Sequence, residues 1–103
     1  MLRARLARLD ELPVDDLRAF AVPGLTWPVL AGVVDGEVIA TAGVCPHEDV
    51  GLDGGAVDDG CLTCPGHGYV FDLRTGACRH DRSLTLRRYR TRVIDGEVWV
   101  ELV

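Results

Sequence analysis

Cys45-Pro46-His47 and Cys64-Pro65-Gly66-His67 are the two segments on which the rest of the sequence depends, and sixteen residues separate them. Each segment supplies one cysteine and one histidine, and thiolate and imidazole both bind soft or borderline metal ions strongly. A zinc finger usually carries both cysteines on one element and both histidines on the other. The order found here instead suits a binuclear centre in which one iron takes both thiolates and the other takes both imidazoles.

The sequence that begins at the second cysteine, Cys64-Pro-Gly-His-Gly-Tyr-Val-Phe-Asp-Leu-Arg-Thr-Gly76, resembles the Rieske iron–sulfur family almost residue for residue. The resemblance implies one [2Fe-2S] cluster per chain, held by Cys45, His47, Cys64 and His67, and no catalytic residues. It also implies that both imidazoles lie at an exposed tip, where the electron enters and leaves.

The chain departs from the respiratory branch of this family at four positions. That branch has two further cysteines, joined as a disulfide, where this sequence has Val50 and Gly66. It also has a Ser and a Tyr hydroxyl that bond to cluster sulfur atoms, where this sequence has Tyr69 and Phe71. Because Phe71 has no hydroxyl, fewer hydrogen bonds stabilise the reduced cluster. We therefore expect a potential of about −150 mV, near the low end of the Rieske range.

Two other uses of the cysteines are considered. Four cysteines in a short chain can form two disulfides, but a reducing cytosol opposes this. A zinc site is the other alternative, with Cys61-x-x-Cys64, Cys45 and His47 as its ligands. That set leaves His67 without a role.

The remaining cysteines and the third histidine are interpreted as ordinary structural residues. Cys61 and Cys78 are predicted to be free thiols in strands, because cysteine often acts as a small buried hydrophobic residue. His80 is predicted to be a surface residue.

Composition indicates one small soluble domain over residues 1–103. Hydrophobic residues make up 48% and charged residues 26% of the chain, which is ordinary for a globular protein. The longest uncharged run, residues 19–34, contains Pro23, Gly24 and Pro28, so it does not predict a membrane-spanning helix. With no signal segment near Met1, we expect a cytoplasmic protein. A net charge of -5 makes a nucleic-acid partner unfavourable.

The first half of the chain predicts strands. Residues 2–9 alternate apolar residues with arginine, with Leu2, Ala4, Leu6 and Leu9 as candidates for the inner face, although a short helix fits this segment almost as well. Residues 14–20 are interpreted as a loose helical turn. Residues 27–34 and 37–44 flank Asp35-Gly36, a strong signal for a two-residue hairpin.

The second half continues the pattern. Residues 56–57 and 61–63 predict a short pair of strands, and residues 69–73 predict one further strand. Residues 86–94 and 97–103 flank a second Asp-Gly hairpin signal. These segments predict an all-β fold. The resemblance implies the Rieske fold: an antiparallel β-sandwich or barrel base, residues 1–43 and 82–103, with an inserted cluster-binding subdomain, residues 44–81.

Charge is uneven along the chain. Residues 35–81 contain nine acidic residues against Arg74 and Arg79, while residues 82–92 contain five arginines and no acid. One interpretation is simple solvation of the surface. The other is that the acidic cluster end steers docking onto a basic partner.

The chain has no room for a substrate pocket, a nucleotide-binding motif or a mononuclear iron triad, so we predict a carrier and not an enzyme. The resemblance implies a monomeric Rieske ferredoxin that passes electrons from an NAD(P)H-dependent flavoprotein reductase to a terminal oxygenase, either a ring-hydroxylating dioxygenase or a di-iron monooxygenase. The alternative is a small Rieske-like subunit of a larger reductase, such as assimilatory nitrite reductase.

Overall fold

The computed structural model describes residues 2–66 and 68–102, which are almost entirely β-structure, as predicted. The strands are β1 (Arg3–Arg8), β2 (Arg18–Phe20), β3 (Val29–Val34), β4 (Glu37–Ala42), β5 (Ala56–Asp58), β6 (Cys61–Thr63), β7 (Val70–Asp72), β8 (Arg90–Ile94) and β9 (Glu97–Glu101). One short 3-10 helix, η1 (Leu9–Glu11), follows β1. No helix in the described residues has the length and apolar character needed to cross a membrane.

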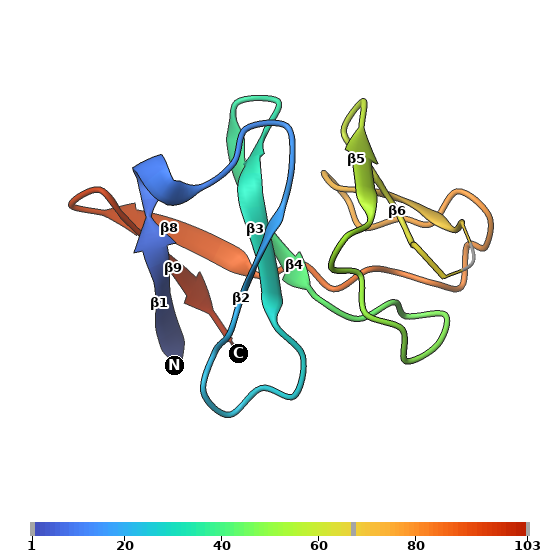
Figure 1. The fold of residues 1–103 in the computed structure, drawn as a ribbon, viewed down its shortest axis with the longest axis horizontal. Helices are drawn as coiled ribbons and strands as arrows, with labels where there is room; N and C mark the ends of the chain where they lie inside the picture. Colours follow the sequence, from blue (N-terminus) through green and yellow to red (C-terminus); the bar gives the residue numbers. More distant parts are fainter. Residues whose placement is uncertain (1, 67, 103) are drawn as a thin grey trace.

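The strands form three antiparallel sheets of three strands each, in the orders β1-β9-β8, β2-β3-β4 and β5-β6-β7. Figure 1 shows the first sheet and both termini at one end of the molecule and β5 and β6 at the other. Both predicted Asp-Gly hairpins are confirmed. At each turn the Asp and the Gly have positive φ, as a type I′ hairpin requires.

Strand β3 is buried on both faces, which explains why its sequence is an unbroken apolar run. Its residues alternate between two hydrophobic cores, with Leu30 in one and Ala31 in the other. The cluster-side core consists of Leu30, Val34, Ile39, Cys45, Leu52, Leu62, Cys64, Phe71, Leu73, Cys78 and Leu86. The far core consists of Ala7, Leu12, Val22, Val29, Ala31, Ala40, Val98 and Val100. The β2-β3-β4 sheet is therefore the layer between them.

The predicted helical turn over residues 14–20 is wrong, because this segment follows the edge of β3. The Asp15 N–H donates to the Val33 carbonyl at 2.7 Å, and the Val33 N–H donates to the Pro13 carbonyl at 2.8 Å. Strand β2 then pairs with β3. The chain crosses so close to Gly32 that a Cβ there would overlap the Asp16 carbonyl. The neighbouring backbone, and not local helical preference, determines this conformation.

Strand β1 forms, but its inner face is only partly as predicted. The register with β9 shifts between Arg5 and Ala7, which is typical of a β-bulge. After the bulge Ala7 points inward and is 4% exposed, while Leu2 and Leu9 are 65% and 37% exposed. Ala4 and Leu6 are partly buried, as predicted. The prediction that Leu2 and Leu9 face inward is wrong, because Leu2 precedes the strand and Leu9 lies in η1, beyond the bulge.

The predicted strand over residues 86–94 is shorter, since β8 starts at Arg90. The residues before it lie along β4 instead: the Ala42 N–H donates to the Arg87 carbonyl, and the Tyr89 N–H donates to the Ala40 carbonyl, both at 2.9 Å. Strands β5, β6 and β7 form a sheet of their own within residues 44–81. This supports the division into base and cluster-binding subdomain, which stays a prediction.

Candidate metal centre

The two ligand loops are built alike, and each one starts at a cysteine. The Cys45 N–H donates to the Val50 carbonyl at 2.8 Å, and the Cys64 N–H donates to the Tyr69 carbonyl at 2.7 Å. In both loops the acceptor lies five residues after the cysteine. The first loop follows β4, and the second joins β6 to β7. The ends of β4 and β6 therefore set the positions of the two predicted thiolate ligands.

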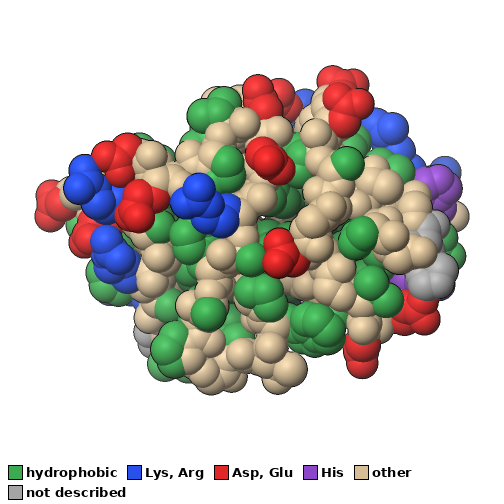
Figure 2. All heavy atoms as spheres, viewed as in Figure 1, with side chains coloured by type: hydrophobic (Ala, Val, Ile, Leu, Met, Phe, Trp, Pro, Cys, Tyr) green, Lys and Arg blue, Asp and Glu red, His purple; other side chains and the backbone are tan. Residues whose placement is uncertain are grey.

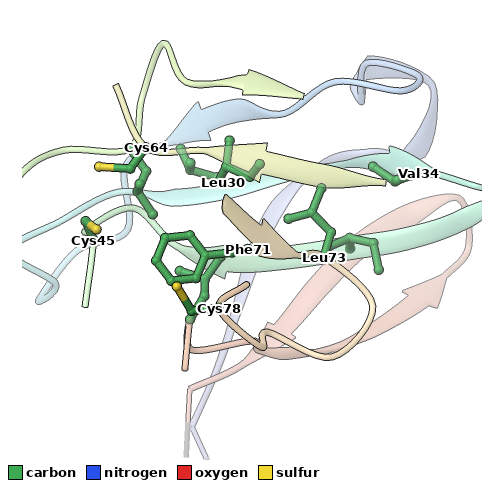
Figure 3. Packing of buried hydrophobic residues seen from close by; sticks show 11 residues of the cluster. Leu30, Val34, Cys45, Cys64, Phe71, Leu73 and Cys78 are labelled. Atoms are coloured by element: carbon green, nitrogen blue, oxygen red, sulfur yellow. The ribbon is translucent and has the colours of Figure 1, made fainter. Parts of the chain in front are cut away.

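The two loops bring the cysteine side chains together at the edge of the cluster-side core. Cys45 is 2% exposed and Cys64 is 1% exposed. Figure 3 shows both sulfur atoms on the same side of this core, beyond the Phe71 ring. The two thiols are close enough that Cys64 raises the pKa of Cys45. Two neighbouring buried thiols from two different loops are what one iron would need in order to take both thiolates, and this ligand assignment stays a prediction.

The surroundings of Cys45 suit a thiolate that is bound to metal. Burial raises the pKa of the Cys45 thiol, and contact with Cys64 raises it further. The backbone N–H groups of His47 and Glu48 lower it by donating hydrogen bonds to the sulfur atom. Because iron-bound thiolates accept such bonds and metal binding removes the thiol proton, the residues present fit an iron–sulfur centre.

His47 lies outside the buried thiol pair, at the surface, with its side chain 30% exposed. Its ring contacts the edge of Tyr69, with ring centroids 4.3 Å apart. This position agrees with an imidazole at an exposed tip. His67, the predicted fourth ligand, lies outside the described residues, so its role stays a prediction.

The alternative cysteine chemistries are less well supported. All four cysteines are free, which disagrees with two disulfides. The zinc alternative used only described residues, Cys45, His47, Cys61 and Cys64, yet no three Cys, His, Asp or Glu side chains among the described residues converge on one point. A single zinc ion needs at least three such ligands together, whereas a two-iron centre needs only two at each iron.

Comparison with known proteins decides the family, because residues 3–90 match the Rieske [2Fe-2S] domain. The chain belongs to the Rieske family. Its predicted fold class and its family resemblance are both confirmed. Membership of this family implies a [2Fe-2S] cluster as the cofactor.

Two relatives that this chain matches along almost their whole length are ferredoxins. The anthranilate 1,2-dioxygenase ferredoxin subunit of Burkholderia cepacia is 34% identical over 98 residues, covering 94% of this chain and 89% of the relative. The solved ferredoxin of carbazole 1,9a-dioxygenase from Nocardioides aromaticivorans IC177 is 31% identical, covers 97% of each chain and has a TM-score of 0.83. Both agree with the prediction of an electron-transfer component and not an enzyme.

The same fold occurs in the second protein class that the sequence suggested. A structure described as an NADH-dependent nitrite reductase small subunit, from Mycobacterium tuberculosis, has a TM-score of 0.84 and covers 99% of this chain and 96% of that chain. Its sequence identity is 22%, so the likeness shows the fold alone.

Val50 and Gly66 face each other across the two ligand loops of this Rieske protein. A Cβ placed on Gly66 would lie 3.7 Å from the Val50 Cβ and 3.1 Å from its Cγ1. Disulfides have Cβ atoms about 3.5–4.5 Å apart. The structure therefore places face to face the two positions at which the respiratory branch carries its disulfide.

A Val50→Cys/Gly66→Cys double variant should form a disulfide between the ligand loops. Closing this loop should stabilise the protein by up to about 3 kcal/mol, mainly by restricting the unfolded chain. Thiol titration in denaturant should find two fewer free thiols than the reduced variant contains, and the melting temperature should fall when dithiothreitol is added. Val50→Cys alone is the control. Full thiol reactivity of the double variant after air oxidation would contradict this contact.

His80 is a neighbour of the centre that its position in the sequence did not reveal. It is exposed, as predicted. Its ring also stacks on Tyr69, the residue that contacts His47. The signal that points to it is the tight turn at Thr75-Gly76, which folds the chain after the second loop back along β7. An antiparallel return at that turn brings His80 opposite Tyr69.

Proposed function

We propose that this protein is the Rieske ferredoxin of a multicomponent oxygenase. It carries one electron at a time from an NAD(P)H-dependent flavoprotein reductase to a terminal oxygenase, which is a ring-hydroxylating dioxygenase or a di-iron monooxygenase. The observation that carries this proposal is the end-to-end correspondence with ferredoxins: 97% of this chain and 97% of the carbazole dioxygenase ferredoxin superpose.

The residues that would hold the cluster, one per chain, are Cys45, His47, Cys64 and His67. When bound, the cluster supplies a one-electron couple at a higher potential than an all-cysteine cluster. The buried thiol pair keeps water from the sulfur side, and the N–H groups of His47 and Glu48 stabilise negative charge on Cys45. His47 at the surface gives the electron a short route to a docked partner.

The dithionite-reduced protein should give a rhombic EPR signal whose average g value is below that of all-thiolate clusters. Two irons and two acid-labile sulfides per chain should accompany it. An EPR-silent protein with stoichiometric zinc would contradict the proposal.

The reduction potential should lie at about −150 mV, near the low end of the Rieske range. Phe71 is fully buried beside the thiol pair and has no hydroxyl to donate to sulfur, so the reduced state lacks one source of stabilisation. Potentiometric titration followed by EPR measures this value. A potential above zero would contradict this argument from the missing hydroxyl.

We further propose that carboxylates around the tip steer docking onto basic surfaces of the reductase and the oxygenase. Glu48, Asp49 and Asp53 are exposed on or next to the first ligand loop. The pKa of Asp81 is lowered, chiefly because the Ser83 hydroxyl donates to its carboxylate at 2.6 Å, so Asp81 stays ionised at neutral pH. Figure 2 shows histidine side chains at the end of the molecule away from the β1-β9-β8 sheet, with acidic side chains close to them.

Electron transfer to the oxygenase should slow as ionic strength rises, since salt screens attraction between exposed charges. Asp49→Asn should lower the second-order rate several-fold at low salt. Asp95→Asn is the matched control, because it removes the same charge at the β8-β9 turn and Asn tolerates the positive φ there. Stopped-flow kinetics measure both. A rate that is independent of salt would remove the electrostatic part of the proposal.

We propose that the protein acts as a monomer in the cytoplasm. A carrier must leave one partner before it meets the next, so it should elute alone at its own mass of 11.2 kDa. The alternative, a permanent small subunit of a larger reductase such as nitrite reductase, predicts poor solubility alone and a stable complex with the large subunit. Size-exclusion chromatography of the isolated chain distinguishes the two.

A further inference from the structure

Tyr69 lies between two imidazole rings, one of which belongs to a proposed cluster ligand. Its ring meets His47 edge-on, with ring centroids 4.3 Å apart and an angle of 64° between the planes. The His80 ring also stacks on Tyr69, with ring centroids 5.7 Å apart and an angle of 20° between the planes. These distances are typical of favourable aromatic pairs. The three rings form a continuous row from the first ligand loop to the exposed surface.

The backbone holds this row in place. Phe71 and Cys78 form an antiparallel bridge, and the Arg79 N–H donates to the Val70 carbonyl at 2.9 Å. The same register puts Tyr69 directly opposite His80, as a cross-strand pair. His80 is also fixed through its Nδ1, which accepts a hydrogen bond from the Val70 N–H at 3.4 Å. The outer ring is thus held by both stacking and a backbone donor.

The row of three rings includes His47, the proposed ligand whose imidazole ring the structure describes at the surface. The His47 side chain is only 30% exposed although its loop lies at the surface, and Tyr69 covers part of it. A ring held by contact on one side has fewer orientations and fewer water neighbours than a bare one. Ligand orientation and solvent access are two properties by which a protein adjusts an iron–sulfur centre.

We propose that His80 is a positioning residue for His47 and acts through Tyr69: the His80–Tyr69 stack fixes the orientation of the His47 ring and limits its contact with water. This inference rests on the proposed function, in which His47 is a cluster ligand. Without the stack, water reaches the ligand ring more freely. Water favours the more highly charged reduced state, so the potential should rise. The His47 ring should also take several orientations, which broadens the EPR lines.

Two variants separate the ring of His80 from its hydrogen bond. His80→Phe keeps a flat ring but loses the acceptor for the Val70 N–H, while His80→Gln keeps an acceptor but has no ring. We expect His80→Phe to retain the g values, line widths and potential of the parent. We expect His80→Gln to have broader EPR lines and a higher potential, with the same far-ultraviolet circular dichroism.

Each other outcome also decides the matter. If His80→Gln matches the parent, or if His80→Phe changes as much as His80→Gln, the stack does not position the ligand. If only His80→Gln fails to retain iron, the ring is needed to hold His47 and the inference is supported; if both variants fail, the ring is not the cause.

The unsubstituted protein tests the proposed function separately. Absence of its rhombic signal contradicts the proposed function, whereas a normal parent with an unchanged His80→Gln contradicts only this inference.

Discussion

A Cys64→Ala variant is expected to contain no iron and no acid-labile sulfide, whereas a Cys78→Ala variant should contain as much of both as the parent. The two cysteines are similarly buried, at 1% and 6% exposed, and both belong to the cluster-side core. Each substitution therefore removes a similarly buried sulfur atom from the same core, so its effect on packing should be similar. Cys64 is a proposed thiolate ligand beside Cys45 and Cys78 is not, so only the loss of Cys64 removes a ligand. Colorimetric iron and sulfide assays, with EPR of the reduced proteins, measure the difference.

Cys61→Ala extends the same comparison to the zinc alternative. In the iron–sulfur assignment Cys61 is a free thiol in β6, and its replacement should leave the cluster content unchanged. In the zinc alternative its replacement removes a ligand and lowers metal affinity. Retention of a rhombic EPR signal by Cys64→Ala, or loss of metal from Cys61→Ala, would overturn the assignment of Cys45 and Cys64.

Gly32→Ala should be among the most destabilising single substitutions in this chain. A Cβ at this position would overlap the Asp16 carbonyl and lie 3.2 Å from the Pro13 carbonyl. Both obstacles are backbone atoms, so no side-chain rotation relieves them. We expect a loss of about 3 kcal/mol or more in the free energy of unfolding, which lowers the melting temperature of a domain of this size by roughly 12 °C or more. Thermal and urea unfolding of the loaded protein measure it.

Gly51→Ala is the matched control for that experiment. Among the described residues, a Cβ at Gly51 would meet the Trp27 ring alone, at 3.5 Å, which is an ordinary contact. The melting temperature of this variant should stay within a few degrees of the parent. A Gly32→Ala protein as stable as Gly51→Ala would mean that residues 13–16 do not lie across β3 as described.

The features that sequence alone predicts well are the ones that depend on local chemistry. Asp35-Gly36 and Asp95-Gly96 specify hairpins because both residues of such a turn need positive φ, which Asp and Gly tolerate. Local chemistry also explains why the cysteines of the two ligand loops follow strand ends, because the Pro and Gly residues beside them stop each strand and turn the chain.

The features that sequence misses depend on which segments become neighbours. Nothing in residues 18–20 distinguishes a strand from a turn until the open edge of β3 supplies backbone partners. Gly32 looks like a weak point in a strand, and only the crossing chain explains it. The bulge after Arg5 likewise reflects pairing with β9 and not a local signal.

The candidate site shows the same division. The resemblance implied Cys45 and Cys64 as the two thiolate ligands, and the structure buries both on the same side of one core. His67 lies outside the described residues, so its assignment still rests on the sequence. The role we propose for His80 depends on a ring stacked across two strands, and residue type alone gave no reason to connect it with His47.

The middle sheet has a consequence for how this protein can change over evolutionary time. It separates the far core from the cluster-side core, so side chains such as Val98 pack without touching the layer that carries the thiols. Substitutions that act on well-separated groups tend to add independently. Thermal tolerance can therefore drift through one core while redox properties are selected through the other. A lineage can adapt to a warmer habitat through substitutions in the far core, or to a new electron acceptor through substitutions in the cluster-side core, and the one change does not require the other.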